Sequence, residues 1–294
     1  MKQFVLMLLL LFALLGFHNA VIIGTQNGLL LWYQTLVPSL LPFILVTNAL
    51  SETNTYQVIA LRFKNKYSNR IYEIMAIILG NLCGYPLGGK IINDFVKNNC
   101  MSSLQANRIL PLASQASPMF LIGYVYIHTL HDKIPLSIYL ISIYLPVIIY
   151  YIIQCLYTDK HSAYTSNPVT PKKIYMKDTF LHAVEIMVMI GIYVMIFSIL
   201  FTILLPIFHT TISKILLSSL EITTGINLLT TLKLSETFRL TTICTLSAFG
   251  GICSAYQVKG VLEYPDTNIK KYLLDKCILS AGTFGIIYLY CKMN

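Results

Sequence analysis

Four short stretches of this 294-residue chain place glycine, proline and polar side chains inside long apolar runs. Because glycine and proline interrupt the helical ladder, such breaks leave backbone N–H and C=O groups free to bind a ligand. The stretches read GNLCGYPLGGK, SQASPMF, LEITTGIN and LSAFGGICSAYQ. The candidate solute-binding residues within them are Asn81, Gly84, Tyr85, Pro86, Gly88, Ser114, Gln115, Ser117, Pro118, Glu221, Thr223, Thr224, Gly225, Ser247, Gly250, Gly251, Ser254 and Gln257.

The chemistry of this set suits binding rather than catalysis. It offers hydroxyls, amides, a phenol and one carboxylate, but it does not assemble a nucleophile, a base and an orienting group. We therefore expect no enzyme activity and no catalytic residue. His128 and His131 lack the further ligands that a zinc site needs, so we expect no metal site. No cofactor is expected either, apart from a coupling cation or proton.

Glu221 is the sharpest single residue, because a carboxylate in a membrane segment is costly and usually functional. It could coordinate a cation, carry a proton or accept hydrogen bonds from a solute. The alternative is a carboxylate near the outer interface, paired with Lys214 or Arg239. Arg108 and Arg239 are open to two interpretations as well: binding of an anionic solute, or snorkelling to opposite membrane faces.

Composition indicates a membrane protein, since 56% of the residues are hydrophobic and only 11% are charged, against about 25% charged in soluble domains. The net charge of +9 is explained by basic cytoplasmic loops, and we expect no nucleic-acid partner. Nine apolar segments follow one another, at 3–23, 27–50, 72–96, 105–130, 134–157, 179–206, 212–232, 238–260 and 275–291. The first is expected to be a retained helix.

The placement of lysine and arginine predicts that two of these segments do not cross the membrane. If 72–96 and 212–232 are re-entrant hairpins, the cytoplasmic loops are 51–71, 158–178 and 259–276, each with four basic residues. In the third loop these are Lys259, Lys270, Lys271 and Lys276. The outer loops, near 131–133 and 207–211, hold only Lys133.

The order of segments then repeats with opposite topology. The half 1–157 contains a first helix, a gate helix, the hairpin 72–96, a broken helix at 105–130 and a connecting helix. The half 179–294 contains a gate helix, the hairpin 212–232, a broken helix at 238–260 and a last helix. Inverted repeats with broken helices are typical of secondary transporters. For a single small-residue patch, close helix packing is the better explanation, but four in matching positions favour a site.

Several motifs also resemble a known family. GLLLWYQTLVPSLLPFIL, GYPLGGK, SQASPMFLIG, EITTG and AFGGICSAYQV are similar to motifs of the YlbJ-type sporulation integral membrane proteins. These belong with the nucleoside recognition, or Gate-domain, proteins, which are distantly related to concentrative nucleoside transporters. The matching positions are Gly84, Pro86, Gly88, Lys90, Ser117, Pro118, Glu221, Thr223, Gly225, Phe249, Gly250, Gly251 and Gln257.

The resemblance implies a role in spore formation, with transport of dipicolinic acid across the outer forespore membrane. This chain is shorter than is usual in the family, and it has QASP where the family is expected to have an Asn-rich or Gly-rich stretch before the proline. We expect a multi-pass cell-membrane permease for a small anionic or aromatic metabolite. Its partners would be the solute, the lipid bilayer and a second copy of the chain. The alternatives are a nucleoside-type permease and a non-transporting scaffold of a spore-envelope complex.

Overall fold

The computed structural model describes residues 12, 14–53, 58, 70–157, 176–264 and 267–293, and this part of the chain contains helices and no strand. Five helical stretches in it are long and apolar enough to cross a membrane. They are His18–Leu50, Leu136–Tyr157, Met176–Leu204, Glu236–Gly260 and Ile269–Met293. The predicted all-α polytopic membrane protein is confirmed at this level.

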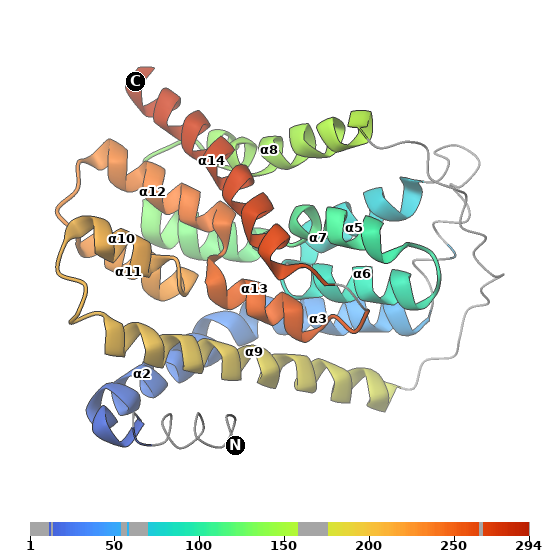
Figure 1. Ribbon diagram of the computed structural model, residues 1–294, viewed down its shortest axis with the longest axis horizontal. Coiled ribbons are helices and arrows are strands. Elements are labelled where there is room, and N and C mark those ends of the chain that lie inside the picture. The colour runs from blue at the N-terminus through green and yellow to red at the C-terminus, as the bar shows by residue number, and fades with distance from the viewer. Residues whose placement is uncertain are drawn as a thin grey trace.

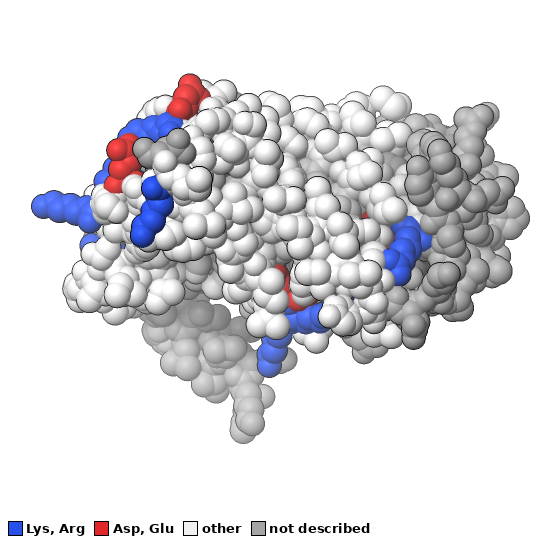
Figure 2. Space-filling view, turned by 90° about the horizontal axis from the view of Figure 1, so that it is seen from above, with Lys and Arg blue, Asp and Glu red and all other residues white. Residues whose placement is uncertain are grey.

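The outer surface supports this assignment. On the helix α9 (Met176–Leu204), Val184, Val188, Ile192 and Ile196 are exposed at a spacing of four residues. On the face in Figure 2, charged side chains gather mainly at one end of the long axis, with smaller groups elsewhere and a broad uncharged surface between them. Apolar stripes of this kind suit contact with lipid.

The first long helix joins two segments that the sequence analysis separates. After a turn at Phe17 the chain is helical without interruption through α2 (His18–Leu31), the π-helical turn η1 (Trp32–Leu36) and α3 (Val37–Glu52). The predicted boundary between segments 3–23 and 27–50 is therefore wrong, and residues 3–11 and 13 of the first segment lie outside the described residues.

Two glycines at this boundary bring α2 close to α9. A Cβ on Gly24 would lie 2.6 Å from Ile199 Cα, and one on Gly28 would lie 2.8 Å from Met195 Cα. Spacing of small residues by four lets two helix backbones approach closely. The run GTQNG thus packs α2 against α9 instead of ending a helix.

The first hairpin range holds two short helices, and the range after it holds a helix broken in the middle. The elements of this half are α5 (Ile71–Cys83), α6 (Leu87–Lys97), α7 (Ser103–Ala113), the π-helical η3 (Phe120–Leu130) and α8 (Leu136–Tyr157). The pattern recurs after α9 with α10 (Thr211–Ser218), α11 (Ile222–Thr231), α12 (Glu236–Phe249), α13 (Gly251–Gly260) and α14 (Ile269–Met293).

The basic loop expected at 259–276 is shorter than predicted. Lys270, Lys271 and Lys276 lie on α14, and Lys276 is buried because its ammonium group bonds to the oxygens of Ser114 and Gln115. The other two predicted basic loops, 51–71 and 158–178, lie almost wholly outside the described residues.

Figure 1 shows how these elements are arranged. The hairpin α5–α6 lies at one end of the long axis and the hairpin α10–α11 at the other, with their turns facing the middle of the molecule. The two broken helices run lengthwise between them. The helices α2, α3 and α9 pack along one side, while α14 crosses obliquely and packs against α8 and α12.

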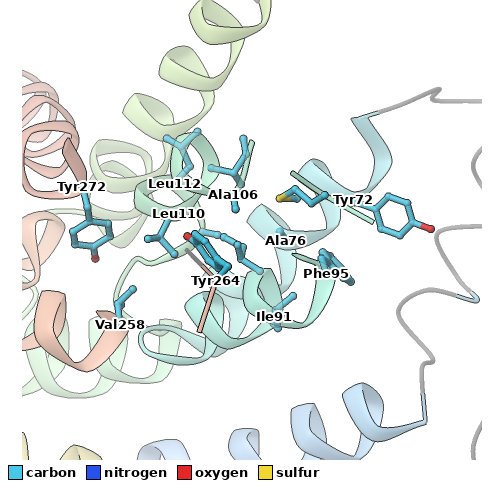
Figure 3. Close-up of a cluster of buried hydrophobic side chains, with 14 of the residues drawn as sticks. Tyr72, Ala76, Ile91, Phe95, Ala106, Leu110, Leu112, Val258, Tyr264 and Tyr272 are labelled. Carbon is cyan, nitrogen blue, oxygen red and sulfur yellow. The ribbon is translucent and has the colours of Figure 1, made fainter. Parts of the chain in front are cut away.

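Apolar packing fixes the first hairpin against its neighbours (Figure 3). Tyr72 of α5 and Phe95 of α6 meet edge to face, with their ring centroids 5.3 Å apart. The same cluster includes Leu110 of α7, Val258 of α13 and Tyr272 of α14. This hairpin is therefore held by elements of both halves of the chain.

Polar contacts mark the two ends of the molecule and give a topology test. Lys97 pairs with Glu263 at one end, and Lys133 pairs with Glu236 at the other. In a background without native cysteines, Asn98→Cys and Thr267→Cys are expected to react with an impermeant thiol reagent from the cytoplasmic side only. Asp132→Cys is expected to react from the opposite side only. Reaction of Asn98→Cys and Thr267→Cys from opposite sides would contradict the re-entrant arrangement of 72–96.

Candidate functional site

The turn of the first hairpin rests on the break of the first broken helix. Gly84 has a φ of +80°, a left-handed conformation that favours glycine, and a Cβ there would lie 2.7 Å from Ser117 N. The next residue in the turn, Tyr85, donates its N–H to Gln115 O at 3.0 Å. The backbone freed by the break is thus used to seat the hairpin.

Within this first break, residues 114–117 are not helical, and side chains satisfy much of the exposed backbone. Gln115 Nε2 donates to Pro111 O at 2.9 Å, and Asn81 Nδ2 donates to Leu112 O at 3.1 Å. Ser117 Oγ accepts from Phe120 N at 3.3 Å and so caps the helix that follows. Gln115 and Asn81 act here as supports for the broken backbone.

Glu221 forms the turn of the second hairpin as the N-cap of α11. Its Oε1 accepts from Thr223 N at 3.1 Å, and its Oε2 accepts from Thr224 N and Thr224 Oγ1, both at 2.7 Å. A carboxylate at a helix N-terminus is favoured by the free N–H groups and by the helix dipole. This local arrangement holds the carboxyl group of a residue that is only 2% exposed.

The second break is closed by the second hairpin. Gly250 and Gly251 have φ values of +85° and +84°, so the chain turns sharply between α12 and α13. Ile252 N donates to Ser219 O, and Cys253 N donates to Leu220 O, both at 2.8 Å. The carbonyl groups of one hairpin turn therefore satisfy the N-terminus of the half-helix α13.

All four interruptions border one enclosed cavity. The cavity holds about 30 Å³ of space that the centres of water molecules can reach, which is room for about two waters. Seven of the predicted residues are on its wall, namely Tyr85, Ser117, Glu221, Thr223, Gly250, Ser254 and Gln257. The remaining lining residues are Leu36, Leu40, Ala116, Phe120, Ile190, Val194, Ile222 and Cys253.

The other predicted residues do not line this cavity. They are Asn81, Gly84, Pro86, Gly88, Ser114, Gln115, Pro118, Thr224, Gly225, Ser247 and Gly251. Two of the glycines pack helices together: a Cβ on Gly88 would lie 1.9 Å from Ala113 O, and one on Gly225 would lie 2.1 Å from Ser218 O. Close packing, the alternative weighed from sequence, is thus what the structure shows at these two glycines.

The apolar side of the cavity could not be predicted from the amino-acid pattern. Leu36 and Leu40 come from η1 and α3, and Ile190 and Val194 come from α9. Each is an aliphatic residue within a long apolar helix, so nothing in its type or spacing distinguishes it from lipid-facing neighbours. Their position becomes visible only when the two helices pack beside the breaks.

The interface interpretation of Glu221 does not fit its surroundings. Among the ion pairs of the described residues, none joins Glu221 to Lys214 or Arg239. Arg239 instead donates to the carbonyl groups of Leu232 and Leu234, after α11. Beside the carboxylate, the buried Thr223 Oγ1 has no hydrogen-bond partner among the described residues. The cavity wall therefore combines a buried carboxyl group with a hydroxyl group that these residues leave unbonded.

Arg108 neither borders the cavity nor reaches a membrane face. It is buried and pairs with Glu73, a carboxylate that is 1% exposed and was not singled out from the sequence. Gln105 and Tyr151 also donate to Glu73, at 3.4 Å and 3.2 Å. This cluster joins α5, α7 and α8 and supports the scaffold behind the first hairpin.

A second, polar cavity lies on the α5–α6 side of the enclosed one. It offers about 400 Å³ to the centres of water molecules and is lined by Lys90, Asn93, Asp94, Lys97, His182, Glu185, Ile186, Met189, Gly260, Val261 and Glu263. Ile186 precedes Ile190 by about one turn of α9, and Gly260 follows Gln257 by about one turn of α13. One layer of residues thus separates the two cavities.

Comparison with known proteins finds one partial similarity. The chain is 22% identical over 107 residues to the "Sporulation integral membrane protein YlbJ" of Bacillus subtilis (strain 168), across 35% of this chain. The matched stretch spans only 26% of the length of that relative. No protein-family model matches the sequence, and no solved structure matches it. The match agrees with the resemblance seen in the motifs, and together with the apolar helices it identifies a multi-pass integral membrane protein.

Proposed function

We propose that this chain is a secondary transporter, with the enclosed cavity as its solute site and spore formation as its setting. The observation that supports the proposal most strongly is the meeting of two hairpin turns and two helix breaks at one buried cavity. Irregular backbone at membrane depth is costly unless it is buried in protein or lines a cavity. Here it does both, in the arrangement that transporters use at the midplane.

The wall chemistry suits a small solute with a flat apolar body and a polar edge. Leu40, Ile190 and Val194 offer an aliphatic surface, while Ser117 and Thr223 offer hydroxyl groups. A solute of this kind is an aromatic carboxylate such as dipicolinic acid. Since Glu221 would repel an anion in a site that excludes water, its uptake would need a proton or a coupling cation beside that carboxylate.

The carboxylate also supports a second candidate, a nucleoside-type permease. An ionised Glu221 accepts hydrogen bonds and cannot donate them, so a neutral solute rich in hydroxyl groups would bind without charge compensation. Tyr85 and Phe120, both on the cavity wall, are placed to pack against a base.

Access requires movement, because the enclosed cavity has room for only about two waters. We propose that solute enters through the polar cavity and that the layer between the two cavities is the gate on this side. The hairpins at opposite ends of the molecule (Figure 1) would then open in alternation as the inverted halves rock around the site.

The direct test is uptake by purified protein in sealed liposomes. Labelled dipicolinate, uridine and succinate are offered in turn, with and without a proton or sodium gradient. We expect saturable uptake of dipicolinate or uridine, abolished by the unlabelled compound in excess. Binding of none of the three and no uptake under any gradient would contradict the transporter proposal and favour a scaffold of a spore-envelope complex.

A further inference from the structure

A lysine is buried beside the first helix break, and it does not line the cavity proposed as the solute site. Lys276 of α14 is 1% exposed, and its Nζ lies 2.7 Å from Gln115 Oε1 and 3.1 Å from Ser114 O. No ion pair among the described residues joins it to a carboxylate. The neighbouring Asp275 accepts from Tyr150 instead, at 2.7 Å.

The partners of Lys276 are the oxygens that the break sets free. Ser114 is the C-cap of α7, so its carbonyl group lies at the end of an 11-residue helix where the dipole is negative. Carbonyl groups at the C-terminal ends of half-helices are the groups that coordinate Na⁺ in broken membrane helices. Here the same kind of oxygen, with a side-chain amide oxygen beside it, is occupied by an ammonium group of the chain.

We propose that Lys276 is a built-in cation at the break between α7 and η3, in the place where freed oxygens would otherwise take a metal cation. The two oxygen contacts stabilise the ammonium, and the ammonium fixes the break. The second break carries no such group among the described residues, because carbonyl groups of the α10–α11 turn bond to α13 directly.

The contact reaches the solute cavity through one residue. Lys276 orients the side chain of Gln115, and the backbone carbonyl oxygen of Gln115 accepts from Tyr85 N at 3.0 Å. Tyr85 lines the cavity, and so do Ala116 and Ser117, which directly follow Gln115. Lys276 is thus a positioning residue that joins α14 to the first hairpin turn. Its effect on transport rests on the proposed function, whereas its cation role does not.

The test measures melting temperature in purified protein, so failure of the transporter proposal would not affect it. We compare Lys276→Met, Lys276→Arg and Lys276→Ala with Lys271→Ala, an exposed lysine on the same helix. Lys276→Met leaves both oxygens without a donor, and a fall of roughly 5 °C or more is expected. Lys276→Arg retains the charge and is expected to stay nearer to the wild type.

The decisive measurement is rescue of Lys276→Ala by small cations. Methylammonium or Na⁺, compared with N-methyl-D-glucamine at equal ionic strength, is expected to raise the melting temperature of Lys276→Ala and not that of Lys271→Ala. Equal responses of the two variants would overturn the inference, as would a Lys276→Met protein as stable as the wild type. If Lys276→Met does not fold, a folded Lys276→Arg protein supports the inference. If neither variant folds, the shape of the lysine side chain rather than its charge is required, which overturns the inference.

Discussion

Replacement of Glu221 with glutamine is expected to reduce solute uptake at least about ten-fold, or about 1.4 kcal/mol, while the protein remains folded. Glutamine keeps one acceptor oxygen for the N-cap bonds but removes the buried negative charge. Because even loss of a whole cap costs about 0.5–2 kcal/mol, the effect on stability should be small. Uptake rates in liposomes and the melting temperature of the purified variant measure the two effects separately.

The matched control is Glu236→Gln. Glu236 is exposed, begins α12 and pairs with Lys133 at one end of the molecule, far from the cavity wall. We expect it to change uptake less than about two-fold, since exposed ion pairs contribute about 0–1 kcal/mol. Full activity of Glu221→Gln would mean that the carboxylate serves only as the N-cap of α11 and has no role in transport. Binding would then rest on hydroxyls and backbone.

A single methyl group at Gly88 is expected to destabilise the protein severely. The Cβ of Gly88→Ala would lie 1.9 Å from Ala113 O, a backbone atom of the neighbouring helix α7 that cannot rotate away. Overpacking a core costs about 1–3 kcal/mol, occasionally more, and a backbone clash should reach the upper part of this range. Folded yield and melting temperature of the purified variant provide the measurement.

Gly285→Ala on α14 is the control, because a Cβ there would meet no atom within 4 Å. We expect its melting temperature to match the wild type. If Gly88→Ala were as stable as Gly285→Ala, the close contact of the first hairpin with α7 would be wrong. The position of the α5–α6 turn beneath the cavity would then be wrong as well.

The hairpins and breaks could be predicted because their signals are local. Glycines such as Gly84 and Gly250 adopt backbone conformations that other residues avoid, and Pro86 and Pro118 mark where a helix must restart. The short helices on either side then follow from the apolar runs. The positions of these interruptions could therefore be anticipated to within a few residues.

Where the prediction was wrong, a tertiary contact overrides the local pattern. The apolar segments predict a boundary at 24–26, but Gly24 and Gly28 let α2 lie against α9 and the helix continues. Lys276 reads as a loop residue because a lone lysine belongs in water, yet freed oxygens of a distant helix surround it. Likewise, Gly88 and Tyr85 come from one motif, but Gly88 packs against α7 whereas Tyr85 lines the cavity. Only the packing of α7 distinguishes the two roles.

The most direct test of the cavity as the solute site uses two native cysteines. Cys253 lines the cavity and is 2% exposed, while Cys277 is exposed on α14. Variants that retain one of them are alkylated with N-ethylmaleimide in the presence of the transported compound, dipicolinate or uridine. We predict that this compound slows alkylation of Cys253 at least about five-fold, because a pocket buries most of the surface of its ligand and the ligand in turn covers the residues of the wall. The alkylation rate of Cys277 is expected to stay unchanged. A compound that is transported yet leaves the alkylation rate of Cys253 unchanged would contradict the central claim.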